Sequence, residues 1–168
     1  MDASRKSEPT NKRVTVERTS ERELVVTRTF DAPARLVFEA WTRPELFKQW
    51  WVPKSMGATL HSCEMDVRVG GRYRLGFGGG MDFFGRYLEV TPHSRLVWTN
   101  EEGGESGQVT TVTFEEKGGG QTLLVVRELY PSKEALDAAG TGAADAMVET
   151  FAQLHELLVS LGASVGRS

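Results

Sequence analysis

Hydrophobic and polar residues alternate in seven short stretches of this sequence, which glycine, proline and other turn residues separate. Alternation with a period of two residues predicts half-buried β-strands. The predicted strands cover residues 24–30, 58–69, 72–77, 82–90, 95–100, 109–115 and 121–130. The last six follow one another through short connections, a spacing that is typical of a continuous antiparallel meander.

Three details refine this pattern. In the second predicted strand, the alternation of apolar and polar residues is out of register between Leu60 and Cys63. This break predicts a β-bulge there. The glycine stretch at residues 76–80 does not lead into a helix and lacks the lysine of a phosphate-binding loop, so we expect a hairpin turn. Gly70 and Gly71 predict another tight turn, because such turns need positive φ angles.

A pair of short helices is predicted between the first two strands. Pro33 suits a first helical turn, where its missing N–H group would have no partner. The apolar residues that follow recur at helical spacing: Leu36, Val37, Ala40 and Trp41. Pro44 ends this helix and opens a second short one, which closes on Trp50 and Trp51.

The end of the chain has a helical period instead. A helix is predicted at residues 143–161, because apolar residues recur there at spacings of three and four and so share one face. This face consists of Met147, Val148, Phe151, Leu154, His155, Leu158 and Leu161. The opposite face carries Asp145, Glu149, Gln153 and Glu156. A shorter helix at 132–139 is predicted before it, with Ser132 as its N-terminal cap.

One long amphipathic helix after seven antiparallel strands can bury its apolar face on the concave side of a curved sheet. The expected fold class is therefore α+β, with two layers. Residues 22–163 are expected to form this single domain, between a flexible polar N-terminal tail at 1–21 and a short C-terminal tail at 164–168.

Composition agrees with a folded domain of this kind. The chain has 168 residues, of which 39% are hydrophobic, and a net charge of −3 without a basic stripe, which argues against nucleic acid as a partner. Its single cysteine, Cys63, cannot form an intrachain disulfide. No apolar run approaches the length of a membrane helix, and the N-terminus lacks the apolar segment of a secretory signal, so we expect a cytoplasmic location and no membrane partner.

The order of these motifs resembles a known superfamily. The resemblance lies in the strand, proline-led helix and tryptophan pair of residues 30–51 and in the strand, glycine turn and strand of residues 66–74. Over roughly residues 22–161 the chain resembles the SRPBCC (START-like, helix-grip) superfamily. Within it, the chain resembles the AHSA-type group, the homologues of the C-terminal domain of the activator of the heat-shock protein 90 ATPase.

In that superfamily the space between sheet and helix is commonly a ligand chamber. The residues that we expect to line it here are Trp50, Trp51, Tyr73, Phe77, Phe84, Trp98, Met147, Phe151 and His155. Apolar walls with a few polar groups are usual for small-molecule sites. The alternative is that these side chains fill a solid core, because large aromatic residues dominate core packing in general.

Polar groups that could orient a ligand are His61, Glu64, Asp66, Arg68, Arg72, Arg74, Arg86, Arg127, Glu128 and His155, most of which are expected on the outer face of the sheet. His61 and Cys63 would lie about 7 Å apart on one strand face, too far for an activating hydrogen bond. The neighbouring His, Cys, Glu and Asp residues do not have the spacing of a tetrahedral metal site. No metal, cofactor or catalytic residue is therefore predicted.

The first hypothesis is a protein that binds a small apolar or aromatic molecule. A chaperone co-factor or stress-response partner is the alternative that the resemblance implies. A cyclase- or hydrolase-like enzyme using the same cavity is the third hypothesis, and it would need acid–base groups inside the chamber. We expect a monomer or a homodimer, the dimer if Val97, Val109 and Val125 are exposed on the outer face.

Overall fold

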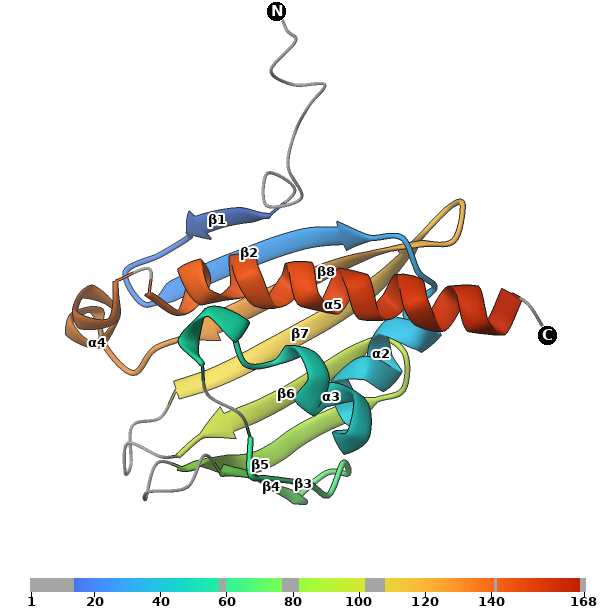
Figure 1. Ribbon diagram of the computed structural model, residues 1–168. Helices are drawn as coiled ribbons and strands as arrows, with labels where there is room; N and C mark the ends of the chain where they lie inside the picture. Colours follow the sequence, from blue (N-terminus) through green and yellow to red (C-terminus); the bar gives the residue numbers. More distant parts are fainter. Residues whose placement is uncertain (1–13, 58–59, 77–81, 102–107, 141, 167–168) are drawn as a thin grey trace, which may run out of the picture.

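The described part of the chain contains one antiparallel sheet of eight strands, covered on one face by helices (Figure 1). In this computed structural model the described residues are 14–57, 60–76, 82–101, 108–140 and 142–166. The strands are β1 (Thr15–Arg18), β2 (Glu23–Phe30), β3 (Ser62–Met65), β4 (Arg72–Gly76), β5 (Asp82–Thr91), β6 (Arg95–Asn100), β7 (Gln108–Lys117) and β8 (Gln121–Leu129). Their order in the sheet is β1-β2-β8-β7-β6-β5-β4-β3. The predicted meander is confirmed, and its last strand pairs with β2.

Strand β1 was not predicted, because it lies in the segment that we expected to be a tail. All four of its residues are exposed, so the sequence carries no alternation between buried and exposed positions there. Its pairing with β2, which runs from Thr15 opposite Thr27 to Arg18 opposite Leu24, adds an edge to the sheet.

The second predicted strand is much shorter than expected. Strand β3 pairs with β4 in a continuous register from Ser62 to Met65. Just before it, the backbone N–H of His61 donates to the carbonyl oxygen of Gly76, the residue that also faces Ser62. The described pairs do not contradict the predicted bulge between Leu60 and Cys63, which stays a prediction. The apolar residues beyond β3 belong to the connection to β4, in which Val69 is 68% exposed. At Gly71 a Cβ atom would lie 1.9 Å from the carbonyl oxygen of Asp66, so only glycine fits this turn. The pairing of β5 with β6 has a register shift between Tyr87 and Glu89, which was not predicted.

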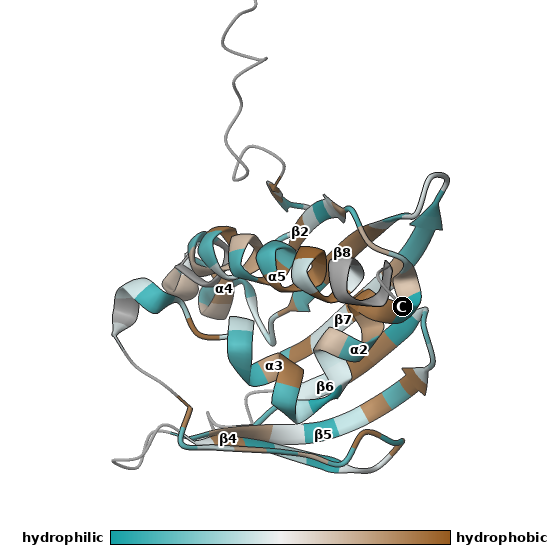
Figure 2. Ribbon diagram, turned by 45° about the vertical axis from the view of Figure 1, so that its right-hand side comes forward, coloured by the Kyte–Doolittle hydropathy of each residue, from teal (hydrophilic) through white to brown (hydrophobic). Residues whose placement is uncertain are grey.

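The helices are α2 (Ala34–Thr42), α3 (Pro44–Trp50), α4 (Lys133–Ala139) and α5 (Gly142–Gly166), with a short 3-10 turn at Lys54–Met56. The Ser132 side chain caps α4 as predicted, by accepting a hydrogen bond from the backbone N–H of Ala135. Helices α2, α3 and α5 lie on the same face of the sheet (Figure 1), and Figure 2 shows the sheet curving from β2 and β8 around them to β4 and β5.

The apolar face of α5 packs against the concave side of the sheet, as the helical period predicted. Phe151, Leu154 and Leu158 are at most 1% exposed and belong to one core with residues of the central strands and α2. Arg28 on β2 is equally buried, with its guanidinium over the Phe30 ring and one nitrogen donating to the carbonyl oxygen of Phe151. Among the described residues, no helix combines the length and the apolar character that crossing a lipid bilayer requires.

Candidate functional site

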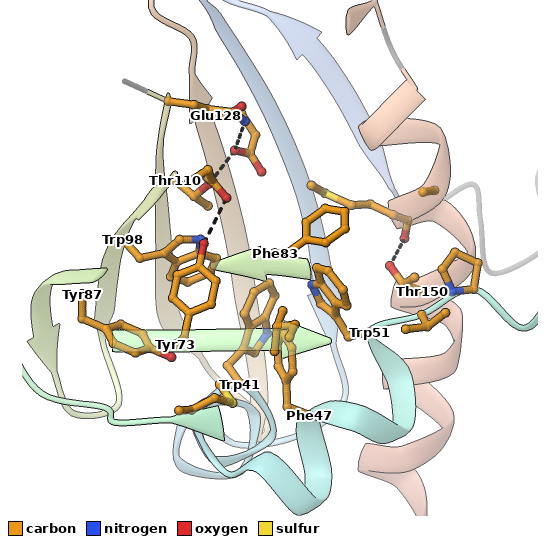
Figure 3. A pocket seen from close by; sticks show the side chains of 18 of the residues that line it. Trp41, Phe47, Trp51, Tyr73, Phe83, Tyr87, Trp98, Thr110, Glu128 and Thr150 are labelled. Atoms are coloured by element: carbon orange, nitrogen blue, oxygen red, sulfur yellow. Dashed lines mark hydrogen bonds between the residues drawn. The ribbon is translucent and has the colours of Figure 1, made fainter. Parts of the chain in front are cut away.

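A cavity of about 500 Å³ lies between the sheet, the end of α3 and the first half of α5 (Figure 3). This volume is within the range of small-molecule sites, which is roughly 300–1,000 Å³. Its walls are formed by Trp41, Phe47, Trp51, Val52, Pro53, Met65, Tyr73, Leu75, Phe83, Tyr87, Trp98, Asn100, Gln108, Thr110, Glu128, Tyr130, Ala139, Ala146, Met147 and Thr150. Helix α5 therefore has two roles: residues 146–150 cover the cavity, and the next turns pack on the sheet.

Aromatic rings from three parts of the chain meet along one wall. The ring of Trp51, just after α3, stacks on Phe47 with centroids 5.6 Å apart and meets Phe83 of β5 edge-on at 5.5 Å. Trp41 of α2 contacts Trp98 of β6 at 5.9 Å. These rings support one another in fixed orientations, so they form a preformed apolar surface.

The other end of the cavity is polar and centres on Glu128 of β8, which is 7% exposed. The hydroxyl of Thr110 and the amide of Gln108 donate to its Oε1 atom, at 2.6 and 3.2 Å. The amide of Asn100 donates to the Thr110 hydroxyl at 2.8 Å, which extends the network to a third strand. Figure 3 shows Glu128 and Thr110 together, away from Phe47 and Trp41.

Two tyrosines line the cavity with phenols that resist ionisation. Burial raises the pKa of Tyr130, and the negative charge of Glu128 raises it further. The pKa of Tyr87 is raised strongly, by burial first and then by the charges of Cys63 and Asp66. Both groups are therefore neutral hydroxyls at physiological pH. A third tyrosine, Tyr73, donates from its hydroxyl to the carbonyl oxygen of Thr99 at 2.8 Å.

Glycine at position 85 makes room for Tyr73. A Cβ atom there would lie 2.0 Å from the carbonyl oxygen of Thr99 and 2.9 Å from the Tyr73 ring. The missing side chain lets the tyrosine ring cross β5 and reach its hydrogen-bond partner on β6. Gly85 thus shapes the cavity wall without lining it.

The polar face of α5 holds the segment that follows α3, which forms one side of the cavity. The amide of Gln153 donates to the carbonyl oxygens of Trp50 and Val52, at 3.0 and 2.9 Å, and accepts from the backbone N–H of Lys54. The carboxylate of Glu149 accepts from the backbone and hydroxyl of Ser55, and these bonds lower its pKa. These two residues, which were predicted on the polar face of the helix, therefore position Val52 and Pro53.

The structure places the predicted cavity residues in different environments. Four of them line the cavity: Trp51, Tyr73, Trp98 and Met147. Trp50 and Phe151 lie in the solid core instead, and each is 1% exposed. The indole N–H of Trp50 donates a hydrogen bond to the carbonyl oxygen of Ala40, which holds this ring in the core. His155 is half-buried beside the Phe30 ring and does not line the cavity.

The prediction for Phe84 is wrong in its choice of strand face. Phe84 is 37% exposed on the outer side of β5, and its neighbour Phe83 lines the cavity. Successive residues of a strand point to opposite faces, so an error of one residue moves a side chain out of the site. Phe77 lies outside the described residues.

Sequence reasoning also missed several residues of the wall, among them Trp41, Phe47 and Tyr87. Glu128 was among the predicted polar candidates, and it points inward because it continues the alternation of the buried residues Leu124 and Val126. The other polar candidates of the sheet are exposed, as expected: His61, Glu64, Asp66, Arg68, Arg72, Arg74, Arg86 and Arg127.

Cys63 points to the inner side of β3 and is half-buried, while His61 is exposed. Burial raises the pKa of the Cys63 thiol to about 11, although the charge of Lys48 opposes this effect. Within the described ranges no three His, Cys, Asp or Glu side chains are grouped as a metal site would require.

The three valines on the outer face of the central strands are less exposed than we expected. Val97 is 5% exposed, and Val109 and Val125 are partly buried. We expected a dimer if these valines were exposed, and Val97 is not. The oligomeric state therefore stays a prediction.

A curved antiparallel sheet that holds a long C-terminal helix over a cavity defines a helix-grip protein of the SRPBCC superfamily. Residues 31–159, more than half of the chain, match the family described as activator of Hsp90 ATPase homolog 1-like protein, and the chain belongs to this family. No curated protein matches the sequence.

Solved bacterial structures share the fold over almost their whole length. A protein from Rhodobacter sphaeroides is 25% identical, with a TM-score of 0.76, over 88% of this chain and 99% of that one. A protein from Nitrosomonas europaea is 26% identical, with a TM-score of 0.75, over 87% and 99% of the two chains. A protein from Chromobacterium violaceum is 26% identical, with a TM-score of 0.69, over 82% and 97%.

Proposed function

We propose that this protein binds a small, largely apolar molecule with an aromatic body in the cavity beneath α5. The observation that carries the proposal is the cavity of about 500 Å³, which has aromatic rings along its wall. A solid core would leave no such volume, because protein interiors are close-packed. Membership of the family agrees with a ligand-binding domain.

The arrangement of the walls favours a flat ligand. Trp51, Phe47 and Phe83 hold one another by stacked and edge-on contacts, so a ring system can slide between rigid surfaces with little loss of side-chain entropy. Met147 on α5 adds a flexible, polarisable contact that adapts to the outline of the guest.

The test uses N-phenyl-1-naphthylamine, a neutral aromatic probe whose fluorescence increases in apolar surroundings. We expect enhanced probe emission together with quenching of the protein's tryptophans. At a probe concentration 100 times its dissociation constant, binding should stabilise the fold by about 2.7 kcal/mol. For a chain of this size that corresponds to a rise in Tm of roughly 5 to 10 °C.

Two variants of α5 make the test specific for the cavity. Ala146→Phe puts a ring into the space beneath the helix, whereas Val159→Phe adds the same ring at a position that is 50% exposed. We expect the first variant to abolish probe binding and the second to leave it unchanged. Equal binding by both variants, or no probe binding by the wild type across a panel of aromatic compounds, would contradict the proposal.

A further inference from the structure

The hydroxyl of Tyr87 is a polar group of the cavity that the fold itself does not use. Tyr87 is 3% exposed, lies on the inner face of β5 and lines the cavity. Its ring contacts the rings of Tyr73 and Trp98, with centroids 5.9 and 6.3 Å apart, and these contacts fix its orientation. Figure 3 shows the ring extending from its strand into the pocket, with the hydroxyl oxygen at its tip.

No hydrogen bond joins this hydroxyl to another residue in the described part of the chain. The hydrogen bonds of Tyr87 are those of its backbone, among them one from the N–H of Gly70 and one to the carbonyl oxygen of Gly71. Tyr73 differs in this respect, because its hydroxyl is committed to the carbonyl oxygen of Thr99. Of these two neighbouring tyrosines, Tyr73 therefore serves the sheet, and the hydroxyl of Tyr87 is left for another partner.

The hydroxyl oxygen of Tyr87 is open to the cavity and is not sealed among packed side chains. Among the described residues, the side-chain atoms that are both fully enclosed and unpaired include the indole nitrogen of Trp41, but not the oxygen of Tyr87. An accessible oxygen on a side chain that is buried on the inner face of the sheet faces the cavity. Buried tyrosine hydroxyls usually find a hydrogen-bond partner. Here that partner has to come from the contents of the cavity.

The surroundings of this hydroxyl favour an uncharged acceptor. Burial raises the pKa of Tyr87 strongly, so the phenol keeps its proton at physiological pH and can donate it in a hydrogen bond. None of the described residues that line the cavity is a lysine, arginine or histidine. An ionised carboxylate or phosphate would lose its hydration there without gaining a basic partner. A carbonyl or ether oxygen carries no such cost.

We propose that Tyr87 determines the specificity of the cavity, because its hydroxyl donates a hydrogen bond to an uncharged oxygen of the ligand. The ligand is then a neutral aromatic molecule with a carbonyl or ether oxygen. This assignment rests on the proposed function, since it names the chemical class of the molecule that the cavity takes and the residue that selects it. A ligand without such an oxygen would leave the hydroxyl unpaired, which lowers its affinity.

The experiment compares three probes that share one ring system and nearly one shape. The ketone is 2-acetylnaphthalene, the hydrocarbon is 2-isopropenylnaphthalene, which has a CH₂ group in place of the oxygen, and the acid is 2-naphthoic acid, which is ionised at pH 7. Dissociation constants are measured at pH 7 by calorimetry and by displacement of N-phenyl-1-naphthylamine. We expect the wild-type protein to bind the ketone roughly tenfold or more tightly than the acid, because the acid finds no basic partner.

Tyr87→Phe removes the hydroxyl and keeps the ring. We expect this variant to bind the ketone about three- to tenfold more weakly than the wild type does, which is the effect of one lost hydrogen bond. Its affinity for the hydrocarbon should stay within about twofold, because the apolar shape of the wall is unchanged. The variant should fold normally, since the hydroxyl has no partner among the described residues. Thr91→Val removes a hydroxyl at an exposed position of the same strand and should leave both affinities unaltered.

The outcomes separate this assignment from the proposed function. A selective loss of ketone affinity in Tyr87→Phe supports the assignment. An unchanged ketone affinity in this variant, an equal loss for ketone and hydrocarbon, or tightest binding of the acid by the wild type would overturn the assignment and leave the proposed function in place. No binding of any of the three probes or of N-phenyl-1-naphthylamine would remove the proposed function as well.

Discussion

The side-chain amide of Gln153 donates to the carbonyl oxygen of Trp50 at 3.0 Å, which joins the middle of α5 to the end of α3 across 103 positions of sequence. The same side chain bonds the backbone at Val52 and Lys54. A single glutamine therefore fixes the segment that carries Trp51 into the cavity wall.

Replacing Gln153 should loosen that segment. We expect Gln153→Ala to lower the free energy of unfolding by about 1–3 kcal/mol, because it leaves partly buried backbone groups without partners. Urea denaturation measures the loss. The control is Glu156→Ala on the exposed face of the same helix, which should stay within about 0.5 kcal/mol of the wild type. An equal effect of both changes would show that the Gln153 contacts contribute nothing specific.

The adjacent tryptophans at the end of α3, Trp50 and Trp51, should respond differently to replacement by phenylalanine. Trp50→Phe removes the bond to the carbonyl oxygen of Ala40 and part of a fully buried ring, so we expect a loss of about 2 kcal/mol in the free energy of unfolding. Trp51→Phe alters a half-buried cavity wall and should cost less than about 1 kcal/mol while weakening the binding of N-phenyl-1-naphthylamine. Identical stabilities would contradict the division between core and cavity.

A methyl group at Gly85 should be poorly tolerated. Its Cβ would lie 2.0 Å from the carbonyl oxygen of Thr99. This oxygen belongs to the backbone of a paired strand, so it cannot move aside as the end of a flexible side chain can. We therefore expect Gly85→Ala to destabilise the fold by at least about 2 kcal/mol. Gly162→Ala in α5 meets no atom within 4 Å and should stabilise by up to about 1 kcal/mol. Thermal unfolding of both variants gives the comparison, and a neutral Gly85→Ala would refute the close approach.

The thiol of Cys63 should react slowly. With a pKa of about 11, far fewer molecules carry the reactive thiolate at pH 8 than for an ordinary thiol, whose pKa is about 8.5. The higher intrinsic reactivity of a more basic thiolate offsets roughly tenfold of this deficit. We expect labelling by Ellman's reagent to be about 20-fold slower than for glutathione.

The pH dependence of this labelling has a defined sign. Because the raised pKa delays ionisation, the rate should still increase about tenfold per pH unit between pH 9 and 10, where glutathione levels off. Cys63→Ser gives the background rate, since it removes the single cysteine of the chain. A rate that levels off near pH 9 would contradict the burial effect.

The sequence by itself determined most of the fold. The strands at 72–76, 82–91 and 95–100 were predicted to within one residue, because a half-buried strand carries its period of two in the local sequence. The apolar stripe of α5 was readable for the same reason: Phe151, Leu154 and Leu158 recur at the spacing of one helical face.

The tertiary structure decided which of the candidate side chains form the cavity. Residues 83 and 84 are both phenylalanine, so residue type does not distinguish them. The pairing of β5 with β4 directs Phe83 into the cavity. Trp50 ends α3 and Trp51 follows it directly. The packing of α3 against α2 and α5 places Trp50 in the core, whereas Trp51 lies at the cavity. Local periodicity specifies a face of an element, but the space between elements depends on register and helix rotation, which distant contacts set.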